Sequence, residues 1–177
     1  MTMDYTTEYN SPIGKILLAS NGTSITGLWF LDQNHFGTTL RSPALDGTSL
    51  PVLQQAIQWL DDYWRGTNPS PATLPIQLRG TAFQQETWKL LLELPYGTTI
   101  TYGELARRYA VKSGIEAMSA RAVGNAVGRN PISIIIPCHR VVGASGRMTG
   151  YAGGIVRKTA LLQHERKSIS TPPPLTF

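Results

Sequence analysis

The chain contains a single cysteine, Cys138, among its 177 residues, which excludes an intramolecular disulfide. One thiol and three histidines without ligand spacing also exclude the usual cysteine- and histidine-rich metal sites, so we expect neither a metal nor a cofactor. No apolar run approaches the length of a transmembrane helix, and the first residues lack the pattern of a signal peptide. A lone thiol is typical of a reducing compartment, so we expect a cytoplasmic protein.

Charged residues are also few, at 15% of the chain, and they are distributed unevenly. Residues 1–79 contain four Lys and Arg against six Asp and Glu, a net charge of −2, whereas residues 80–177 contain twelve against five, a net charge of +7. The hydrophobic content of 41% and the mean hydropathy of −0.12 suit a globular protein with a core. The basic half favours a polyanionic partner such as nucleic acid, although a merely solvated basic surface would look the same.

The residues around Cys138 make it a candidate nucleophile. Most single cysteines pack as small hydrophobic side chains. Here Pro137 fixes the preceding backbone, and His139 or Arg140 could favour the thiolate. The apolar run at residues 133–136 predicts a short, fully buried strand that leads into the cysteine. The sequence therefore predicts that a rigid strand end presents Cys138.

The first part of the chain predicts strands followed by a helix. Strands are expected at residues 16–19 and 25–30, and Asn21-Gly22 between them suits a tight hairpin turn. Residues 32–49 are rich in Gly, Thr, Ser and Asp and predict a loop. Apolar residues at helical spacing predict an amphipathic helix over residues 52–64.

Prolines and glycines divide the chain further. Three prolines within residues 66–80 predict a linker, and we place a domain boundary near Gly80. A helix is expected from about Phe83 to Leu94. The segment from Ser168 onward includes three consecutive prolines and is expected to be a flexible tail. The predicted units are residues 1–80, an N-terminal domain with its linker, residues 81–167, a second domain that contains Cys138, and residues 168–177, the tail.

Two more helices are expected in the second half. Thr101 is a good N-cap with Glu104 three residues later, which predicts a helix over residues 102–109. A second helix is expected over residues 119–128, and the pair resembles a helix-turn-helix. Small residues recur at every other position in 120–128, and each glycine costs about 1 kcal/mol relative to alanine in a helix. We expect a close approach to another surface, either a neighbouring helix or an external partner.

Several motifs, in their order along the chain, resemble the O6-alkylguanine-DNA alkyltransferases, also called methylated-DNA–protein-cysteine methyltransferases. Pro137-Cys138-His139-Arg140-Val141 is similar to the active-site signature of that family. The resemblance is strong over roughly the last hundred residues and weak over the first eighty. The other matching segments are residues 81–88, 95–97, 101–106, 121–126, 130–131 and 151–154.

The resemblance implies an α/β (α+β) fold with a small ribonuclease-H-like N-terminal domain and a mostly helical C-terminal domain that contains the helix-turn-helix. It implies DNA repair by irreversible transfer of an alkyl group from O6 of guanine to Cys138, and it leaves O4 of thymine open as a second substrate. The nucleotide would be flipped out of the duplex, and each molecule would react once. The expected partner is double-stranded alkylated DNA, bound through its minor groove by a monomer.

The resemblance also gives individual residues a role. Cys138 would be the nucleophile, His139 the base acting through a water molecule, and Glu165 the carboxylate that orients the histidine. Tyr102 would help to rotate the nucleotide and bond the guanine ring, and Arg121 would enter the base stack in its place. The other residues of the recognition helix expected at the DNA are Ala120, Ala122, Gly124, Asn125, Val127 and Gly128.

Five further residues are expected to form or support the substrate pocket. Asn130 would brace the recognition helix and the cysteine segment, and the backbone of Val141 would contact the guanine amino group. Tyr151, Ala152 and Gly153 resemble the loop that closes the pocket, and a backbone N–H would replace the serine of some relatives at Ala152. Taken singly, each of these residues also has an ordinary structural explanation, such as a turn for Asn130.

Three alternatives compete with this interpretation. A non-catalytic alkylated-DNA binding protein related to the family usually carries tryptophan at the cysteine position, so Cys138 argues against it. A helix-turn-helix regulator would be a dimer with long polar residues on its recognition helix, whereas this helix is rich in alanine and glycine. A Cys–His hydrolase would need an oxyanion hole, for which no motif is present. The absence of zinc-binding cysteines also predicts no role in transcription.

Overall fold

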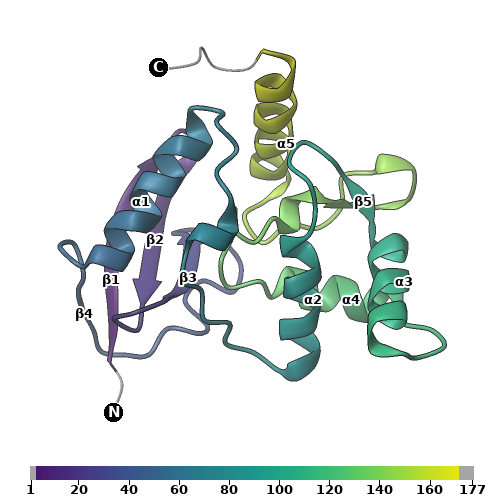
Figure 1. The fold of residues 1–177 in the computed structure, drawn as a ribbon, viewed down its shortest axis with the longest axis horizontal. Coiled ribbons are helices and arrows are strands. Elements are labelled where there is room, and N and C mark those ends of the chain that lie inside the picture. Colours follow the sequence, from purple (N-terminus) through teal and green to yellow (C-terminus); the bar gives the residue numbers. More distant parts are fainter. Residues whose placement is uncertain (1–2, 172–177) are drawn as a thin grey trace.

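The first half of the chain folds as a four-stranded sheet with one long helix against it (Figure 1). The structure is a computed structural model that describes residues 3–171. Its elements are β1 (Asp4–Ser11), β2 (Gly14–Ser20), β3 (Ile25–Phe30), β4 (Ala44–Asp46), α1 (Pro51–Trp64) and the short 3₁₀ helix η1 (Pro71–Thr73). The strands lie in the order β3-β2-β1-β4, with β1–β2 and β2–β3 antiparallel and β4 parallel to β1. Helix α1 packs against β1, β2 and β3.

The second half is mostly helical. Its elements are α2 (Ala82–Leu92), β5 (Ile100–Thr101), α3 (Tyr102–Ser113), α4 (Ala120–Gly128), η2 (Cys138–Arg140), β6 (Val141–Val142), η3 (Ala144–Gly146) and α5 (Ile155–Ser170). Strands β5 and β6 form a small parallel pair. The expected α/β fold, with a sheet in the first half and helices in the second, is confirmed. Within the described residues, no helix is both long enough and apolar enough to cross a membrane.

The four helices predicted from the sequence are present as α1 to α4, and side-chain caps explain where three of them begin. The longest helix, α5, was not predicted. Thr81, Thr101 and Ser119 each accept a hydrogen bond from a backbone N–H in the first turn of α2, α3 and α4, respectively. Helix α1 ends at Trp64 with Arg65 as its C-cap, and Gly66 follows with a φ of +80°, a backbone conformation that favours glycine. Local sequence therefore explains where α2, α3 and α4 begin and where α1 ends.

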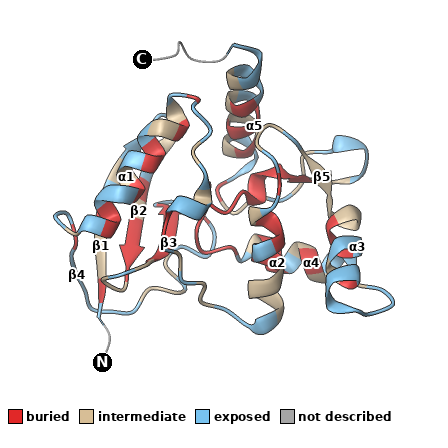
Figure 2. Ribbon diagram, in the orientation of Figure 1, coloured by how far each residue is buried: buried red, intermediate tan, exposed pale blue. Residues whose placement is uncertain are grey.

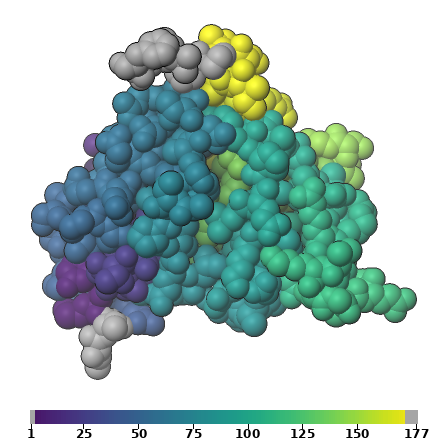
Figure 3. Space-filling view, in the orientation of Figure 1, coloured from purple at the N-terminus to yellow at the C-terminus, as the bar shows by residue number. Residues whose placement is uncertain are grey.

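The two halves share one hydrophobic core. Buried side chains from β2, β3 and α1 form one cluster with those of α2, α4 and α5. Figure 2 shows buried residues in red along these elements, and the halves meet along a broad boundary in the space-filling view (Figure 3). Leu28 in β3 donates its N–H to the carbonyl of Pro131 at 2.9 Å and accepts from the N–H of Ser133 at 3.0 Å. The sheet thus holds the segment that leads to Cys138.

The predicted strand at residues 133–136 is wrong, although the predicted burial is right. The segment is an irregular turn in which Ile134 has a φ of +68° and Ile136 donates its N–H to the carbonyl of Ile132 at 3.0 Å. The Asn130 side chain donates to the Ile136 carbonyl at 2.9 Å and accepts from the Ile132 N–H at 3.0 Å. These bonds satisfy backbone groups that a neighbouring strand would otherwise bond. A run of apolar residues predicts that a segment is buried, but it does not predict that the segment is a strand.

Two boundary predictions also need correction. The hairpin turn spans residues 21–24 rather than the dipeptide alone, because the Asn21 side chain accepts from the N–H groups of Thr23 and Ser24 at 3.0 and 2.8 Å. The tail does not begin at Ser168, since residues 168–170 form the last turn of α5, with the Ser168 hydroxyl donating to the His164 carbonyl at 2.8 Å. The prolines of the predicted tail lie outside the described residues.

Candidate active site

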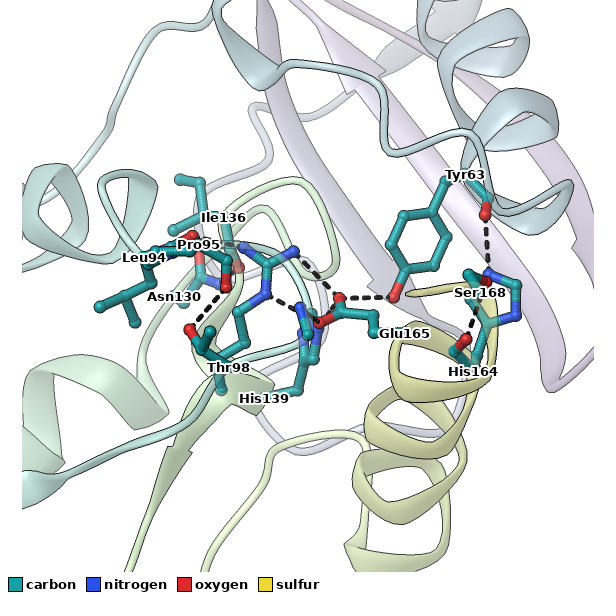
Figure 4. Close-up of polar contacts among 12 residues, drawn as sticks. Tyr63, Leu94, Pro95, Thr98, Asn130, Ile136, His139, His164, Glu165 and Ser168 are labelled. Atoms are coloured by element: carbon teal, nitrogen blue, oxygen red, sulfur yellow. Dashed lines mark hydrogen bonds and ion pairs between the residues drawn. The ribbon is translucent and has the colours of Figure 1, made fainter. Parts of the chain in front are cut away.

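A fully buried carboxylate, Glu165 of α5, accepts hydrogen bonds from several residues, including His139, which directly follows Cys138 (Figure 4). Its Oε1 accepts from the Tyr63 hydroxyl at 2.9 Å and from Arg140 Nη2 at 3.0 Å, and it lies 2.6 Å from His139 Nε2. Its Oε2 accepts from Arg140 Nε at 2.9 Å and from the N–H of Gly97 at 3.0 Å. Burial alone would raise the pKa of Glu165, but the bonds from His139 and Arg140 hold that pKa well below its usual range. Glu165 is therefore ionised.

The imidazole of His139 is buried, and only one of its two ring nitrogens, Nε2, has a hydrogen-bond partner among the described residues. Because Nε2 faces the ionised Glu165 carboxylate, Nε2 carries the proton of the neutral ring and Nδ1 is the unprotonated nitrogen. Nδ1 has no hydrogen-bond partner among the described residues. Burial lowers the pKa of His139, although the Glu165 carboxylate opposes this effect. The ring is thus neutral near pH 7, with Nδ1 available as a base.

Cys138 begins the 3₁₀ helix η2, which places its thiol next to a cavity. Its side chain is buried, and burial raises the pKa of the thiol, while Asn130 and the charge of Lys158 act in the opposite direction. Of the two residues that could favour the thiolate, Arg140 has its guanidinium bonded to Glu165 and to the Leu94 carbonyl, which leaves His139 as the candidate. The resting site therefore contains a thiol and a neutral imidazole rather than a thiolate.

Lys158 of α5 is a buried cation that the sequence analysis missed. Its Nζ donates to the carbonyls of Thr149 and Gly150 at 2.9 and 3.1 Å, and burial lowers its pKa to about 8, against an opposing effect of Cys138. A signal for it was present, because the buried face of α5 has the spacing of one helical stripe. The residues of this stripe are Lys158, Leu161, Leu162 and Glu165. Lys158 lies on the same helical face as the predicted catalytic residue Glu165, and this spacing alone indicates that it belongs to the site.

The cavity beside Cys138 measures about 200 Å³ and opens between the two halves of the molecule. Two residues of the first half, Asn34 and His35, line it and were not predicted from the sequence. The N–H of Asn34 donates to the carbonyl of Ala152 at 3.0 Å, which ties the loop after β3 to the loop before α5. The predicted residues that line the cavity with Cys138 are Tyr102, Gly124, Val127, Gly128, Tyr151 and Ala152.

Three of the predicted pocket residues lie outside the lining of this cavity. Asn130 holds the turn before Cys138, and Val141 is fully buried in β6. Gly153 packs so closely that a Cβ there would come within 2.8 Å of the Tyr151 ring and 3.1 Å of the Phe30 ring. These positions support the cavity wall from behind.

A second, open groove of about 710 Å³ runs over α4 and meets the cavity at Gly124 and Gly128. A Cβ on Gly124 would make an ordinary contact of 3.5 Å with the Tyr102 ring, and a Cβ on Gly128 would meet nothing within 4 Å. Packing against a neighbouring helix therefore does not explain these two glycines. The groove is also lined by Ala122 and Asn125, as well as by residues 81, 83 and 84 at the start of α2.

Ala120 and Arg121 lie on the first turn of α4, and both are exposed. Neither lines the cavity or the groove. The structure thus gathers the predicted nucleophile, base and carboxylate, and it places the predicted finger at the edge of the groove-bearing helix. Within residues 3–171, no cluster of three or more His, Cys, Asp or Glu side chains is arranged to hold a metal ion.

Two family models match the chain and together cover most of it. The ribonuclease-like domain of 6-O-methylguanine DNA methyltransferase matches residues 5–78, and the DNA binding domain of the same enzyme matches residues 82–167.

Similar proteins cover nearly the whole chain. A methylated-DNA–protein-cysteine methyltransferase of Mycobacterium tuberculosis is 43% identical over 89% of both chains, and one of Haemophilus influenzae is 42% identical over 94% of this chain and 88% of its own. Among solved structures, that of Mycobacterium tuberculosis OGT in complex with DNA superposes with a TM-score of 0.78 at 42% identity, covering 93% of both chains. The methyltransferase of Methanococcus jannaschii, 20% identical with a TM-score of 0.65, shares the fold.

Proposed function

The chain belongs to the 6-O-methylguanine DNA methyltransferase family, and we propose that Cys138 is the residue to which it transfers the alkyl group. The protein is a methylated-DNA–protein-cysteine methyltransferase, an enzyme that repairs DNA by moving an alkyl group onto a cysteine of its own chain. One observation carries the assignment: Cys138 is the only cysteine, and it lies beside the cavity and directly before His139.

The first step is the loss of the thiol proton. His139 Nδ1 takes that proton, directly or through a bridging water molecule, and the Glu165 carboxylate stabilises the imidazolium through Nε2. The thiolate sulfur then attacks the alkyl carbon, the bond between that carbon and O6 breaks, and its electron pair remains with the guanine. A proton equivalent to the one that His139 took from the thiol then returns, through solvent, to complete the neutral guanine, and His139 becomes neutral again. The positive charge of Lys158 near Cys138 supports the thiolate before attack.

The flipped guanine would occupy the cavity between the two halves. Tyr102 lines this cavity, and its hydroxyl would bond the guanine ring, while the backbone at Ala152, also in the lining, would contact O6. The Val141 carbonyl would contact the guanine amino group from β6, next to the lining. Asn130 and Gly153 would hold the cavity wall in place. Extrusion of the nucleotide costs a few kcal/mol, which contacts made only by the flipped base must offset.

DNA is the partner, and its minor groove would lie against α4. The open glycines Gly124 and Gly128 support this placement, since long side chains there would be rejected by a narrow groove. Arg121 would enter the base stack at the vacated position. The other residues proposed to contact the duplex are Ala120, Ala122, Asn125 and Val127.

The remaining features of the proposal concern the whole protein. Each molecule reacts once, because a thioether is not hydrolysed and no second cysteine can relieve it. The protein acts as a monomer in a reducing, cytoplasmic environment and uses no cofactor. The residues before and after Gly80 would form separate domains on a shared core.

Transfer of label tests the proposal. The protein is incubated with duplex DNA that carries a labelled methyl group on O6 of guanine, and the label on protein and on DNA is counted over time. The expected result is a burst that stops at one methyl group per chain, with the guanine restored. Many transfers per chain would contradict the suicide mechanism, and binding of the modified duplex without any transfer would identify a binding protein instead of an enzyme.

A further inference from the structure

The first half of the chain contributes a side chain to the buried network around Glu165. Tyr63 lies near the C-terminal end of α1, 102 residues from Glu165 in sequence, and its hydroxyl donates to Glu165 Oε1 at 2.9 Å. The ring is buried, so its hydroxyl cannot turn to water. The backbone carbonyl of Tyr63 also lies 2.7 Å from His164 Nε2 (Figure 4). Helix α1 is therefore fastened to α5 at two adjacent points.

The oxygen that Tyr63 bonds is the one that faces the base. His139 Nε2 lies 2.6 Å from the same Oε1, which also accepts from Arg140 Nη2 at 3.0 Å, whereas Oε2 accepts from Arg140 Nε and from the N–H of Gly97. A carboxylate oxygen that accepts an additional hydrogen bond carries less negative charge for its other donors. The hydroxyl of Tyr63 therefore competes with His139 for Glu165, and it also restricts the rotation of the carboxylate.

We infer that Tyr63 is a positioning residue of the alkyl-transfer site, through which the N-terminal half of the molecule sets how strongly Glu165 stabilises the protonated base. The inference rests on the proposed roles of His139 and Glu165. Tyr63 does not touch Cys138 or the cavity beside it, and it acts only through the carboxylate. Its loss should therefore change the pH at which the site works more than the rate at its optimum.

The direction in which the pKa of His139 changes follows from the groups that bond the His139–Glu165 pair. Without the Tyr63 hydroxyl, Oε1 bonds His139 more strongly, the imidazolium is favoured, and the pKa of His139 rises. A base that must be neutral to accept a proton then needs a higher pH, so the acidic limb of the rate profile moves upward. Arg140 and Gly97 still hold Oε2. The other titratable or charged groups that face Glu165 or His139 are Tyr96, Tyr151 and Lys158.

The experiment measures the single-turnover rate of methyl transfer from alkylated duplex DNA between pH 5 and pH 9. Tyr63→Phe removes the hydroxyl and keeps the ring, and we expect the acidic limb to move up by about half to one pH unit, with the plateau changed only several-fold. The matched control is Tyr9→Phe, which removes another tyrosine-to-carboxylate bond to α1, from Tyr9 to Asp61 at 2.8 Å, on the exposed side of the molecule. The control profile should match that of the unchanged protein.

A second variant covers the case in which Tyr63→Phe fails to fold. Tyr63→3-fluorotyrosine keeps the size of the side chain and makes the hydroxyl a stronger donor, so the acidic limb should move down. In a Glu165→Gln background both shifts should vanish. Profiles for Tyr63→Phe and 3-fluorotyrosine that superimpose on that of the active, unchanged protein would overturn the inference alone. Absence of methyl transfer by the unchanged protein would instead overturn the proposed function.

Discussion

The two sides of Cys138 differ in almost every physical respect. Behind it, Glu165 accepts bonds from residues on three separate segments of the chain, and the side chains of His139, Tyr63 and Glu165 are buried. In front of it lie a cavity and an open groove over α4, where a Cβ on Gly128 would meet nothing within 4 Å. The difference indicates that the rear side holds the chemistry fixed in advance, while the front side is shaped for a molecule that the free protein does not contain.

The largest expected effect comes from the residue between the two sides. Cys138→Ala removes the acceptor, so methyl transfer should fall below detection. Because the groove over α4 is untouched, binding of alkylated duplex should remain within a few-fold of the unchanged protein. Gel shift and label transfer on the same preparation check both expectations. Residual transfer by this variant would mean that another side chain accepts the methyl group.

The rear side should behave as one unit. His139→Ala and Glu165→Gln should each slow single-turnover transfer strongly, and the double variant should be little slower than the worse single variant, because the carboxylate acts through the imidazole. Rapid-quench measurements on all three variants test this. Rate losses that multiply fully in the double variant would show that the two residues act independently.

Glu165 should also dominate the acid stability of the rear side. Its pKa is lowered by folding, so it contributes stability above its ordinary value of 4.5, and that contribution is lost as the pH falls below this value. Glu165→Gln leaves Arg140 buried without its anion and should lower the free energy of unfolding by about 3–5 kcal/mol at pH 7. Urea unfolding from pH 7 to pH 3 should show the gap narrowing with acid. A gap that stays constant would mean that the charge is not what stabilises the site.

On the front side, in contrast to the destabilising change at Glu165, adding a methyl group should stabilise the folded protein. Gly128→Ala adds a methyl group where the protein has space, so it should raise the free energy of unfolding by up to about 1 kcal/mol. The same methyl group projects into the groove and should weaken DNA binding several-fold. Gly103→Ala in α3, outside the groove, is the matched control, with a gain in stability and unchanged binding. Equal DNA binding by both variants would remove the groove from the account.

The smallest expected effect is that of Arg121→Ala, which should distinguish DNA binding at α4 from the alkyl-transfer chemistry at Cys138. Arg121→Ala should slow repair of duplex DNA several-fold, because the vacated place in the stack is no longer filled. Its transfer rate from free O6-benzylguanine, which needs no extrusion, should be unchanged. Parallel time courses with the two substrates provide the comparison. Equal losses on both would move Arg121 out of the proposed finger role.

The sequence was most informative where a motif and the chemistry coincide. The order of the motifs identified Cys138, His139 and Glu165, and the structure places them together. Lys158 was missed although its spacing from Glu165 on α5 was readable. The strand expected at residues 133–136 was wrong, because burial was read as conformation while Asn130 supplied the backbone bonds.

Other parts of the site could not be predicted from local patterns. Tyr63 read as an apolar position of an amphipathic helix, and only the packing of α1 on α5 brings its hydroxyl to Glu165. Asn34 and His35 lay in a segment whose composition predicted nothing beyond a loop. In both cases the functional contact joins the two halves of the chain, and a contact of such long range leaves no periodicity in the sequence.

Identification of the alkylated residue tests the central claim most directly. The protein is reacted to completion with duplex DNA containing O6-methylguanine, digested, and analysed by peptide mass spectrometry with fragmentation. The account predicts one added methyl group per chain, located on the sulfur of Cys138, with every other peptide unmodified. A methyl group on any other residue, or an unmodified Cys138 in protein that has repaired its DNA, would contradict it.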